Sequence, residues 1–364
     1  FLETFDGNPT APQPWKPSTW DVTVHSRDVG TWDKLEPVVA MHGSDCGAPP
    51  QTHTITSYDD AVFLCRDHLM TAIKAEGYGV IYLTPNQMVD FSQGEAVVRF
   101  DLSTLRTSQR DWVDLWITPY PEQLQLPLED WLPDLSGVPR NAIHVRMDAF
   151  NGGTNFTVFV INDFVATELP GQSWVSYESM LTPDAKRRDT FELRIARTYI
   201  QFGMPAYHFS WVNADMPALD WGRGVVQFGH HSYNPSKADG CGAVCEPDTW
   251  HWDNIRISPA LPFTILRADR RSAGPDAAGS VHFPAPAPPN AHLRFAGIGS
   301  ALEVSFDGGA SWQAAQLQAQ QKLNEDHFKS YWMPVPTRTS SVQFRGAGWW
   351  GGPWQVRDIS IWAE

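Results

Sequence analysis

The sequence lacks long hydrophobic runs and carries fewer basic than acidic residues. No run of about 18 apolar residues occurs in the 364-residue chain, so we expect no membrane-spanning helix. Lysine and arginine number 27 against 41 aspartates and glutamates, which gives a net charge of −14. Binding to a nucleic-acid backbone needs clustered lysine and arginine, so the composition argues against nucleic acid as the main partner.

Cysteines are few, and they fall as two local pairs, Cys46/Cys65 and Cys241/Cys245. An even number at close spacing predicts two disulfides and an oxidising compartment. A zinc site is the alternative, although neither spacing resembles paired C-x-x-C clusters. The first residues, FLE, do not form a signal peptide. A secreted protein would therefore have lost its leader before this numbering begins.

Long helical patterns are scarce, whereas 29 prolines and 27 glycines predict many turns. Only 182–189 and 317–329 look briefly helical. Alternating or apolar runs of strand length recur in the first part of the chain at Ala61–Ile73, Gly79–Thr84, Glu95–Leu102, Asp111–Tyr120, Ala142–Asp148, Asn155–Ile161, Thr190–Thr198, Tyr207–Val212, Val225–Tyr233 and Trp250–Ile257. This pattern predicts an all-β fold, a β-sandwich.

A Pro-rich break at 259–262 predicts a domain boundary, with residues 1–260 in one domain and 261–364 in a smaller β-sandwich. The second unit contains the strand-like segments 293–295, 301–306, 331–334, 341–344 and 354–362. Trp349, Trp350 and Trp354 lie among glycines there. They would form a carbohydrate-binding surface or, as the favoured alternative, part of the contact with the first domain.

Side chains alternate across a strand, so the parity of each position predicts its face. The apolar positions of four strands predict the core-facing sets, for example Val113, Leu115 and Ile117. The opposite faces would then carry Glu95, Arg99, Asp101, Trp112, Asp114, Trp116, Thr118, Tyr120, His144, Arg146, Asp148, Gln227, His231 and Tyr233, with His230 facing inward. A face that mixes aromatic and ionic groups suggests a glycan cleft. The alternative is an internal polar layer covered by loops or by the second domain.

The first 258 residues resemble the concanavalin A-like lectin/glucanase jelly roll. The resemblance lies in FLETFDG, RDHLMTA, VIYLTP, FSQGEAVVRFDL, DWVDLWITPY and WDNIRIS. It implies a jelly-roll fold, and this superfamily includes lectins, laminarinase-type hydrolases and alginate-lyase-type enzymes. The E-x-D-x-x-E motif of the laminarinase type is absent. The alginate-lyase strand motifs have a loose echo in Glu95–Asp101, Ile143-His144 and Gln227–Tyr233, although Ala142 replaces a glutamine and the lysine is missing.

We expect His231 and Tyr233 to act as general base and acid, with His144 and Arg146 neutralising a sugar carboxylate. A packed His–Tyr hydrogen bond, or an ion pair of these cations with Asp101 or Asp114, would be the structural alternatives. Substrate contacts are expected from Arg99, Asp101, Trp112, Asp114, Trp116, Tyr120, Asp148 and Gln227. Asp6 and Asp253 are expected to hold a structural Ca²⁺, unless Asp253 caps a turn beside Asn254.

These observations predict a secreted protein whose partner is a polysaccharide or oligosaccharide. It would cleave the glycan by lyase-like or hydrolytic chemistry. The alternative is a non-catalytic, lectin-like protein that stacks sugars on Trp112, Trp116 and Tyr120.

Overall fold

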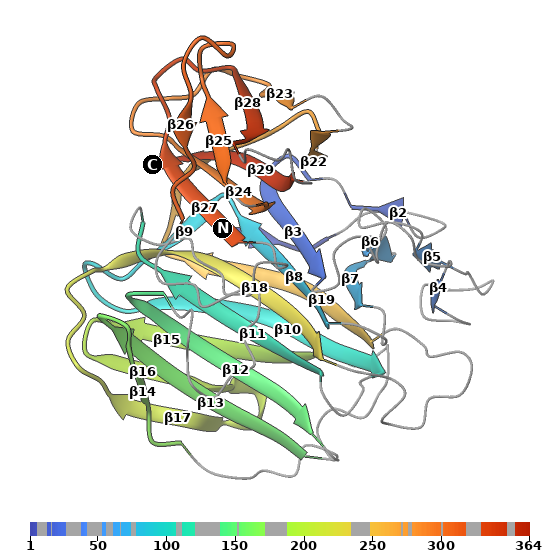
Figure 1. Cartoon of the computed structure of the whole chain (residues 1–364). Helices are drawn as coiled ribbons and strands as arrows, with labels where there is room; N and C mark the ends of the chain where they lie inside the picture. Colours follow the sequence, from blue (N-terminus) through green and yellow to red (C-terminus); the bar gives the residue numbers. More distant parts are fainter. Residues whose placement is uncertain are drawn as a thin grey trace.

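The structure is a computed structural model of the whole chain, shown in Figure 1. It describes residues 1–5, 13–15, 17–26, 38–41, 53–55, 61–65, 67–73, 78–106, 111–120, 139–150, 153–171, 188–233, 248–270, 272–275, 279–299, 301–317, 329–347 and 354–364. Within these ranges the chain is β-structure apart from turns, the short 3₁₀ helix η4 at Pro205–Tyr207, and a 3₁₀ conformation at Pro275. No helix in them has the length and apolar character needed to cross a lipid bilayer.

Two nine-stranded antiparallel sheets make up the first part of the chain. We call one the β10 sheet. Its strands, in spatial order, are β17 (Phe209–Asp215), β16 (Tyr199–Met204), β15 (Asp189–Ala196), β10 (Ala96–Arg106), β19 (Asp248–Ser258), β7 (His68–Ile73), β6 (Val62–Cys65) and β2 (Gln13–Pro14), with β1 (Leu2–Glu3) beside β19.

The other sheet, the β11 sheet, lies across from it (Figure 1). Its order is β14 (Val165–Glu168), β13 (Gly153–Asn162), β12 (Ala142–Phe150), β11 (Asp111–Thr118), β18 (Arg223–Tyr233), β8 (Tyr78–Pro85) and β3 (Trp20–Ser26). Strand β9 (Gln87–Asp90) pairs with β18, and β20 (Ala260–Pro262) pairs with β9. A separate two-stranded sheet joins β4 (Val38–Met41) and β5 (His53–Ile55).

The order of the strands is that of a jelly roll. The chain crosses between the sheets from β7 to β8, from β10 to β11 and from β18 to β19. The strands joined by these crossings have matching positions in the two sheets. In the β10 sheet, β10 and β7 lie on either side of β19, and in the β11 sheet, β11 and β8 lie on either side of β18. The fold is therefore an all-β jelly-roll sandwich, as the sequence predicted.

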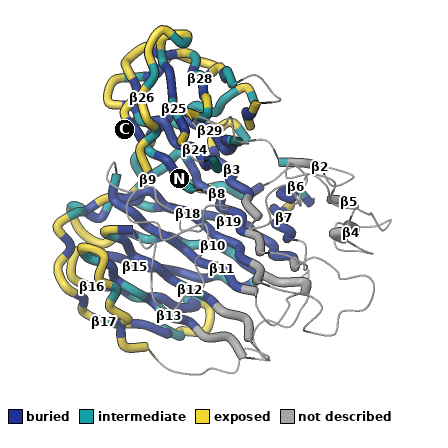
Figure 2. The backbone as a smooth tube through the Cα atoms, viewed as in Figure 1, coloured by how far each residue is buried: buried dark blue, intermediate teal, exposed yellow. Residues whose placement is uncertain are grey.

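The apolar residues of each strand pack between the two sheets. Val113, Leu115 and Ile117 of β11 are fully buried in one core with Val98 and Phe100 of β10. Each of these residues lies on the face that its parity predicted, because strand side chains alternate regardless of which sheet the strand joins. Figure 2 shows this burial as dark blue along the central strands, while exposed stretches gather near β16 and β17.

The C-terminal part forms two smaller sheets around a core of their own. One has the order β21 (Thr264–Arg267), β29 (Gln355–Ala363), β24 (His292–Ile298) and β27 (Lys329–Pro334), with β22 (Ser272–Ala273) beside β29. The other has the order β23 (Ser280–His282), β28 (Ser341–Gly346), β25 (Leu302–Ser305) and β26 (Gln313–Ala314). Trp354 packs against this second core.

Most of the expected strands agree with the structure, but the predicted extents of two were wrong. Ala61–Ile73 is a hairpin of β6 and β7 rather than one strand. The segment predicted as a strand at 207–212 begins with the end of η4, and β17 starts only at Phe209. The expected helices at 182–189 and 317–329 lie mostly outside the described residues, and the ends that are described belong to other elements. Asp189 begins β15, Leu317 makes an isolated bridge with Tyr331, and Lys329 begins β27.

Candidate functional site

Strand β11 places Trp112, Asp114 and Trp116 on the outer face of the β11 sheet, opposite its core-facing residues. Its neighbours β12 and β18 run antiparallel on either side of it. In this register Trp116 lies opposite His144 of β12, and Trp112 lies opposite His231 of β18. Two imidazoles therefore approach the central carboxylate diagonally, one from each side.

Three side-chain nitrogen atoms lie close to one oxygen of Asp114, Oδ2. The Nε2 atoms of His144 and His231 lie 3.3 Å and 3.0 Å from Oδ2, and Trp116 donates its indole N–H to the same atom at 3.0 Å. The His231 contact is at ion-pair distance but is poorly aligned for a hydrogen bond. Oδ1 has no hydrogen-bond partner among the described residues. We call Asp114, His144 and His231 the Asp114 cluster.

The carboxyl of Asp114 is completely buried. Burial raises its pKa, but the charge interaction with His231 and the hydrogen bond from His144 outweigh that effect and hold the pKa well below its usual range. The group is therefore an ionised carboxylate inside the protein. Buried charges of this kind are costly unless they are paired, and here the two imidazoles are the partners.

A glycine provides the space that this carboxylate occupies. Gly229 of β18 lies directly opposite Asp114, and a Cβ atom there would stand 1.9 Å from Oδ1. Any other residue at 229 would displace the carboxylate or the strand. Sequence reasoning missed this role, although a glycine inside a strand pattern is a recognised sign of a close approach.

The aromatic residues of the face are engaged by the histidines. Trp112 stacks on His231 with ring centroids 4.8 Å apart, and Trp116 stacks on His144 at 3.6 Å. The guanidinium carbon of Arg146 lies 4.8 Å from the centre of the Trp112 ring. Both indoles are buried, so neither is an open platform for sugar. The parity argument grouped these residues correctly, but the groove it predicted to be open is a largely buried face.

Other residues predicted for the site have separate surroundings. Gln227 is buried on the same face and donates to the Thr84 hydroxyl at 3.0 Å. Tyr120 packs against the C-terminal unit, and its hydroxyl donates to the Trp362 carbonyl at 3.2 Å. The backbone of Tyr233 ends β18 and that of Asp148 lies in β12, but the side chains of both residues lie outside the described part of the chain.

Arg99 and Asp101 do not belong to this face. They lie on β10, in the other sheet, where Arg99 donates through Nε to Glu192 at 2.8 Å. Asp101 accepts hydrogen bonds from Thr190 at 2.5 Å and from the side-chain amide of Asn254 at 2.7 Å. Parity gives the face of a strand but not its sheet, so placing these two residues with His144 was wrong. His230 faces the core as predicted and contacts the Thr71 hydroxyl at 3.0 Å.

The predicted Ca²⁺ site is described only in part, because Asp6 lies outside the described residues. Asp253 accepts the backbone N–H of Asn254 at 2.8 Å and faces the Nε of Arg188 at 3.7 Å. The expected Ca²⁺ site at Asp6 and Asp253 therefore stays a prediction. Burial raises the pKa of Asp253 to about 6. The described residues contain no group of three or more histidine, cysteine, aspartate or glutamate side chains placed to hold a metal.

Of the four cysteines, Cys65 alone is described. It is buried at the end of β6 and its sulfur is disulfide-bonded. Cys46, Cys241 and Cys245 lie outside the described residues, so both predicted pairings stay predictions. Trp349 and Trp350 lie outside them as well.

No family model and no curated protein matches the sequence. Among solved structures, LamAcat from Zobellia galactanivorans overlaps 71% of this chain and 96% of its own, at 12% identity and a TM-score of 0.43. An immunostimulatory antigen and pseudo β-1,3-glucanase of Mycobacterium tuberculosis overlaps 71% of this chain and 97% of its own, at 12% identity and a TM-score of 0.41. A β-1,3-1,4-glucanase (lichenase) from a mouse hindgut metagenome overlaps 71% of this chain and 98% of its own, at 10% identity and a TM-score of 0.41. Similarity this distant transfers no activity, so function has to be argued from the chain's own residues.

Proposed function

We propose that this chain is an exported enzyme that cleaves a polysaccharide, with the Asp114 cluster as its acid–base centre. The observation that carries the proposal is the ionised, fully buried carboxylate of Asp114 with an imidazole on either side. A buried sheet face gains no stability from such a charge, because apolar residues of similar size would stabilise it as well or better. Perturbed carboxylates with specific partners are typical of functional sites.

The chemistry follows from the atoms in contact. The Nε2 atom of each imidazole lies near Asp114, so a neutral ring with its proton on Nε2 would have Nδ1 as its basic atom. His231 in this state would take a proton from the group that attacks or from a sugar carbon. His144, in the form that carries a proton on both nitrogens, would donate its Nδ1 proton to the oxygen that leaves. Asp114 would hold both rings in place and stabilise the positive charge that forms on His231.

Little of the two imidazoles is exposed, so substrate would reach them only at their edges. The side chain of His144 is 8% exposed and that of His231 is 5% exposed. Arg146, beside Trp112, is only partly buried and would bind sugar hydroxyls or a sugar carboxylate. The disulfide at Cys65 supports export, because such bonds persist in oxidising compartments.

The lectin-like alternative needs free aromatic faces. The stacking of Trp112 on His231 and of Trp116 on His144 disfavours it, and so does the contact of Tyr120 with the C-terminal unit. The acid–base reading uses the same contacts, since stacking holds the imidazoles in position.

The test measures products over a panel of neutral and uronic-acid polysaccharides. Hydrolysis would release reducing ends alone, whereas elimination would also create an unsaturated sugar that absorbs in the ultraviolet. His231→Ala, His144→Ala and Asp114→Asn should each lower turnover at least about 100-fold, the usual size of a general acid–base contribution. Tyr233→Phe tests the acid predicted from the sequence.

His282→Ala is the matched control, because His282 is an exposed histidine paired with Asp269 and lies far along the chain in β23. It should leave turnover unchanged. Full activity in folded Asp114→Asn and His231→Ala proteins would overturn the acid–base role. Binding of a glycan by the wild type without any product would favour the lectin-like alternative.

A further inference from the structure

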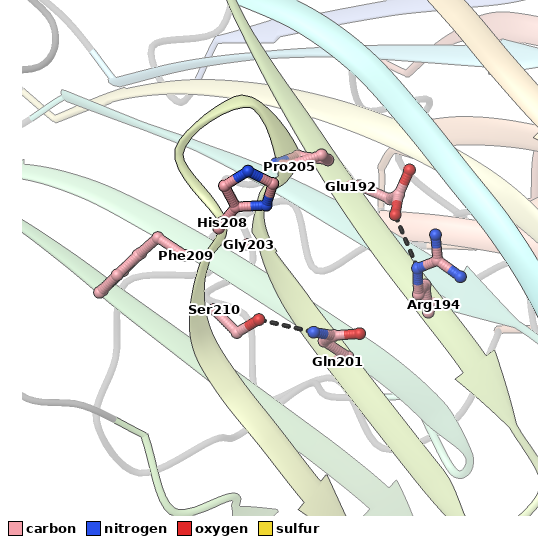
Figure 3. A pocket seen from close by; sticks show the side chains of 8 residues that line it. All are labelled: Glu192, Arg194, Gln201, Gly203, Pro205, His208, Phe209 and Ser210. Atoms are coloured by element: carbon pink, nitrogen blue, oxygen red, sulfur yellow. Dashed lines mark hydrogen bonds and ion pairs between the residues drawn. The ribbon is translucent and has the colours of Figure 1, made fainter.

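A hollow of about 380 Å³ opens on the outer face of the β10 sheet, over β15, β16 and β17 (Figure 3). It is lined by Glu192 and Arg194 of β15, Gln201 of β16, and Phe209 and Ser210 of β17, with Pro205 at the turn. Its size falls within the range of about 300–1,000 Å³ usual for small-molecule sites. The Asp114 cluster lies on the outer face of the other sheet, so the two sites are separate.

The backbone around the hollow has a fixed and unusual shape. The pairing of β16 with β17 shifts register between Phe202 and Gly203, which marks a β-bulge. A Cβ atom on Gly203 would come 2.1 Å from the Phe209 carbonyl oxygen, so only glycine fits there. η4 follows, and His208 ends it in the left-handed conformation with φ of 51°. Bulges of this kind commonly redirect side chains beside binding sites.

The charges at the hollow compensate one another. Glu192 is buried, and it accepts hydrogen bonds from Arg99 at 2.8 Å and from Arg194 at 2.7 Å. Arg194 also donates to Glu95 at 2.8 Å. Two carboxylates thus pair with two guanidinium groups, so these four charges offset one another, and the His208 imidazole is the further titratable group in the lining. An uncharged ligand with hydrogen-bond donors and acceptors would find an acceptor in Glu192 and a donor in Arg194.

The remaining lining suits hydroxyl groups and an apolar ring face. The amide nitrogen of Gln201 donates to the Ser210 hydroxyl at 2.6 Å, and both groups point into the hollow in Figure 3. The amide oxygen and the hydroxyl hydrogen are then available for a ligand. Pro205 adds apolar surface against which the C–H face of a sugar can lie.

We propose that this hollow binds one neutral sugar residue. The proposal goes beyond the acid–base centre and does not depend on it, since its readout is binding rather than turnover. It would hold a polysaccharide on the face of the sandwich opposite to the Asp114 cluster.

The test uses glucose, galactose and mannose as probes, with glucuronate as the charged comparison, in saturation-transfer NMR with the full chain. At least one neutral hexose should give transfer in the wild type. Gln201→Ala/Ser210→Ala should weaken that binding at least 10-fold. Ser210→Phe, which fills the hollow without removing the Gln201 amide, should abolish it. Thermal unfolding would check that each variant is folded.

Asn213→Ala is the matched control. Asn213 accepts a hydrogen bond from the Tyr199 hydroxyl at 2.8 Å across the same two strands, but it does not line the hollow. It should bind as the wild type does. The proposal is overturned if no neutral hexose gives transfer, if glucuronate alone does, or if the filled variant still binds. Loss of hexose binding in Asp114→Asn, with retention in Ser210→Phe, would place the binding at the Asp114 cluster instead.

Discussion

At the scale of single residues, the centre of the β11 sheet depends on a pair that the strand register brings together. Asp114 and Gly229 lie opposite each other in the ladder. The absent side chain of Gly229 leaves the volume that the carboxylate fills. Glycine weakens a strand by roughly 0.5–1 kcal/mol relative to alanine, so its presence in the middle of β18 has a local cost that the position of Asp114 explains.

Gly229→Ala should therefore destabilise the protein in spite of the better strand propensity of alanine. The new Cβ would lie 1.9 Å from Asp114 Oδ1 and 2.9 Å from the Tyr82 ring, and both belong to buried side chains. Overpacking of this kind costs about 1–3 kcal/mol. Urea unfolding should show a lower midpoint, and any glycan-cleaving activity should fall with it.

The control is Gly94→Ala, where a Cβ would have nothing within 4 Å. It should leave the unfolding midpoint almost unchanged. Equal stability of the Gly229 variant and the wild type would mean that the carboxylate does not need this space.

At the scale of elements, β7 and β19 share a second pair of histidines on the outer face of the β10 sheet. His68 and His251 are buried and stacked, with Nδ1 of His251 2.8 Å from Nε2 of His68. Asp67 contacts Nδ1 of His68 at 3.0 Å. Burial lowers the pKa of His68 to about 4, and it lowers that of His251 well below its ordinary value. Both rings are therefore neutral in the folded protein near neutral pH.

This pair should make the fold sensitive to acid. The unfolded chain binds a proton on each histidine below about pH 6.5, whereas folded His68 does so only near pH 4, so stability falls as the pH falls through this window. Acidification through this window should lower the free energy of unfolding by about 3 kcal/mol through His68 alone. Asp253 acts in the opposite sense, because its raised pKa gives stability at low pH that is lost as the pH rises through about 6.

His68→Gln separates the two effects. The difference in unfolding free energy between the wild type and this variant should decrease steadily from pH 6.5 to pH 4, as followed by denaturant titration. His282→Gln, at a histidine whose side chain is 66% exposed, should give a difference that hardly changes with pH. Parallel curves for the wild type and His68→Gln would contradict the buried neutral pair.

At the scale of the whole molecule, the C-terminal unit is joined to the sandwich by a buried polar contact. Arg294 of β24 donates to Asp21 at 3.0 Å and to Thr23 at 3.1 Å, both on β3. Arg267 lies 3.5 Å from the same aspartate. Around this contact, Met88 and Val225 of the first part cluster with residues of the C-terminal unit, among them Phe263 and Trp362. Figure 1 shows the C-terminal unit seated over β3, β8 and β9.

Arg294→Met should weaken this junction. It leaves the buried Asp21 carboxylate with Arg267 alone, and breaking a buried ion pair costs about 3–5 kcal/mol. Calorimetry should then show the C-terminal unit unfolding at a lower temperature than the sandwich, as a separate transition. Adding Asp21→Asn should recover part of the loss, because the uncompensated charge is removed.

Arg345→Met provides the comparison, because Arg345 pairs with Glu303 in an exposed position within the C-terminal unit. Exposed pairs contribute about 0–1 kcal/mol, so this variant should unfold much like the wild type. Unchanged unfolding in the Arg294 variant would show that the apolar contacts alone hold the two parts together.

The sequence by itself determined the all-β class and the face of each side chain along its strand. Alternation is a local property of the extended backbone, so Val113 and His144 could be assigned to opposite faces without knowing their neighbours. The same argument correctly grouped Trp112, Asp114, Trp116, His144 and His231.

Only the tertiary structure decided which strands share a sheet and what each face meets. Strand β10 pairs with β19, about 150 residues further along the chain, and this pairing moved Arg99 and Asp101 away from His144. Long-range pairing also decided that the Asp114 face is buried and that Gly229 stands opposite its carboxylate. The hollow at Gln201 arises from a bulge whose register no local pattern specifies. Contacts between distant segments depend on the packing of the whole core, and alternation along one strand carries no information about them.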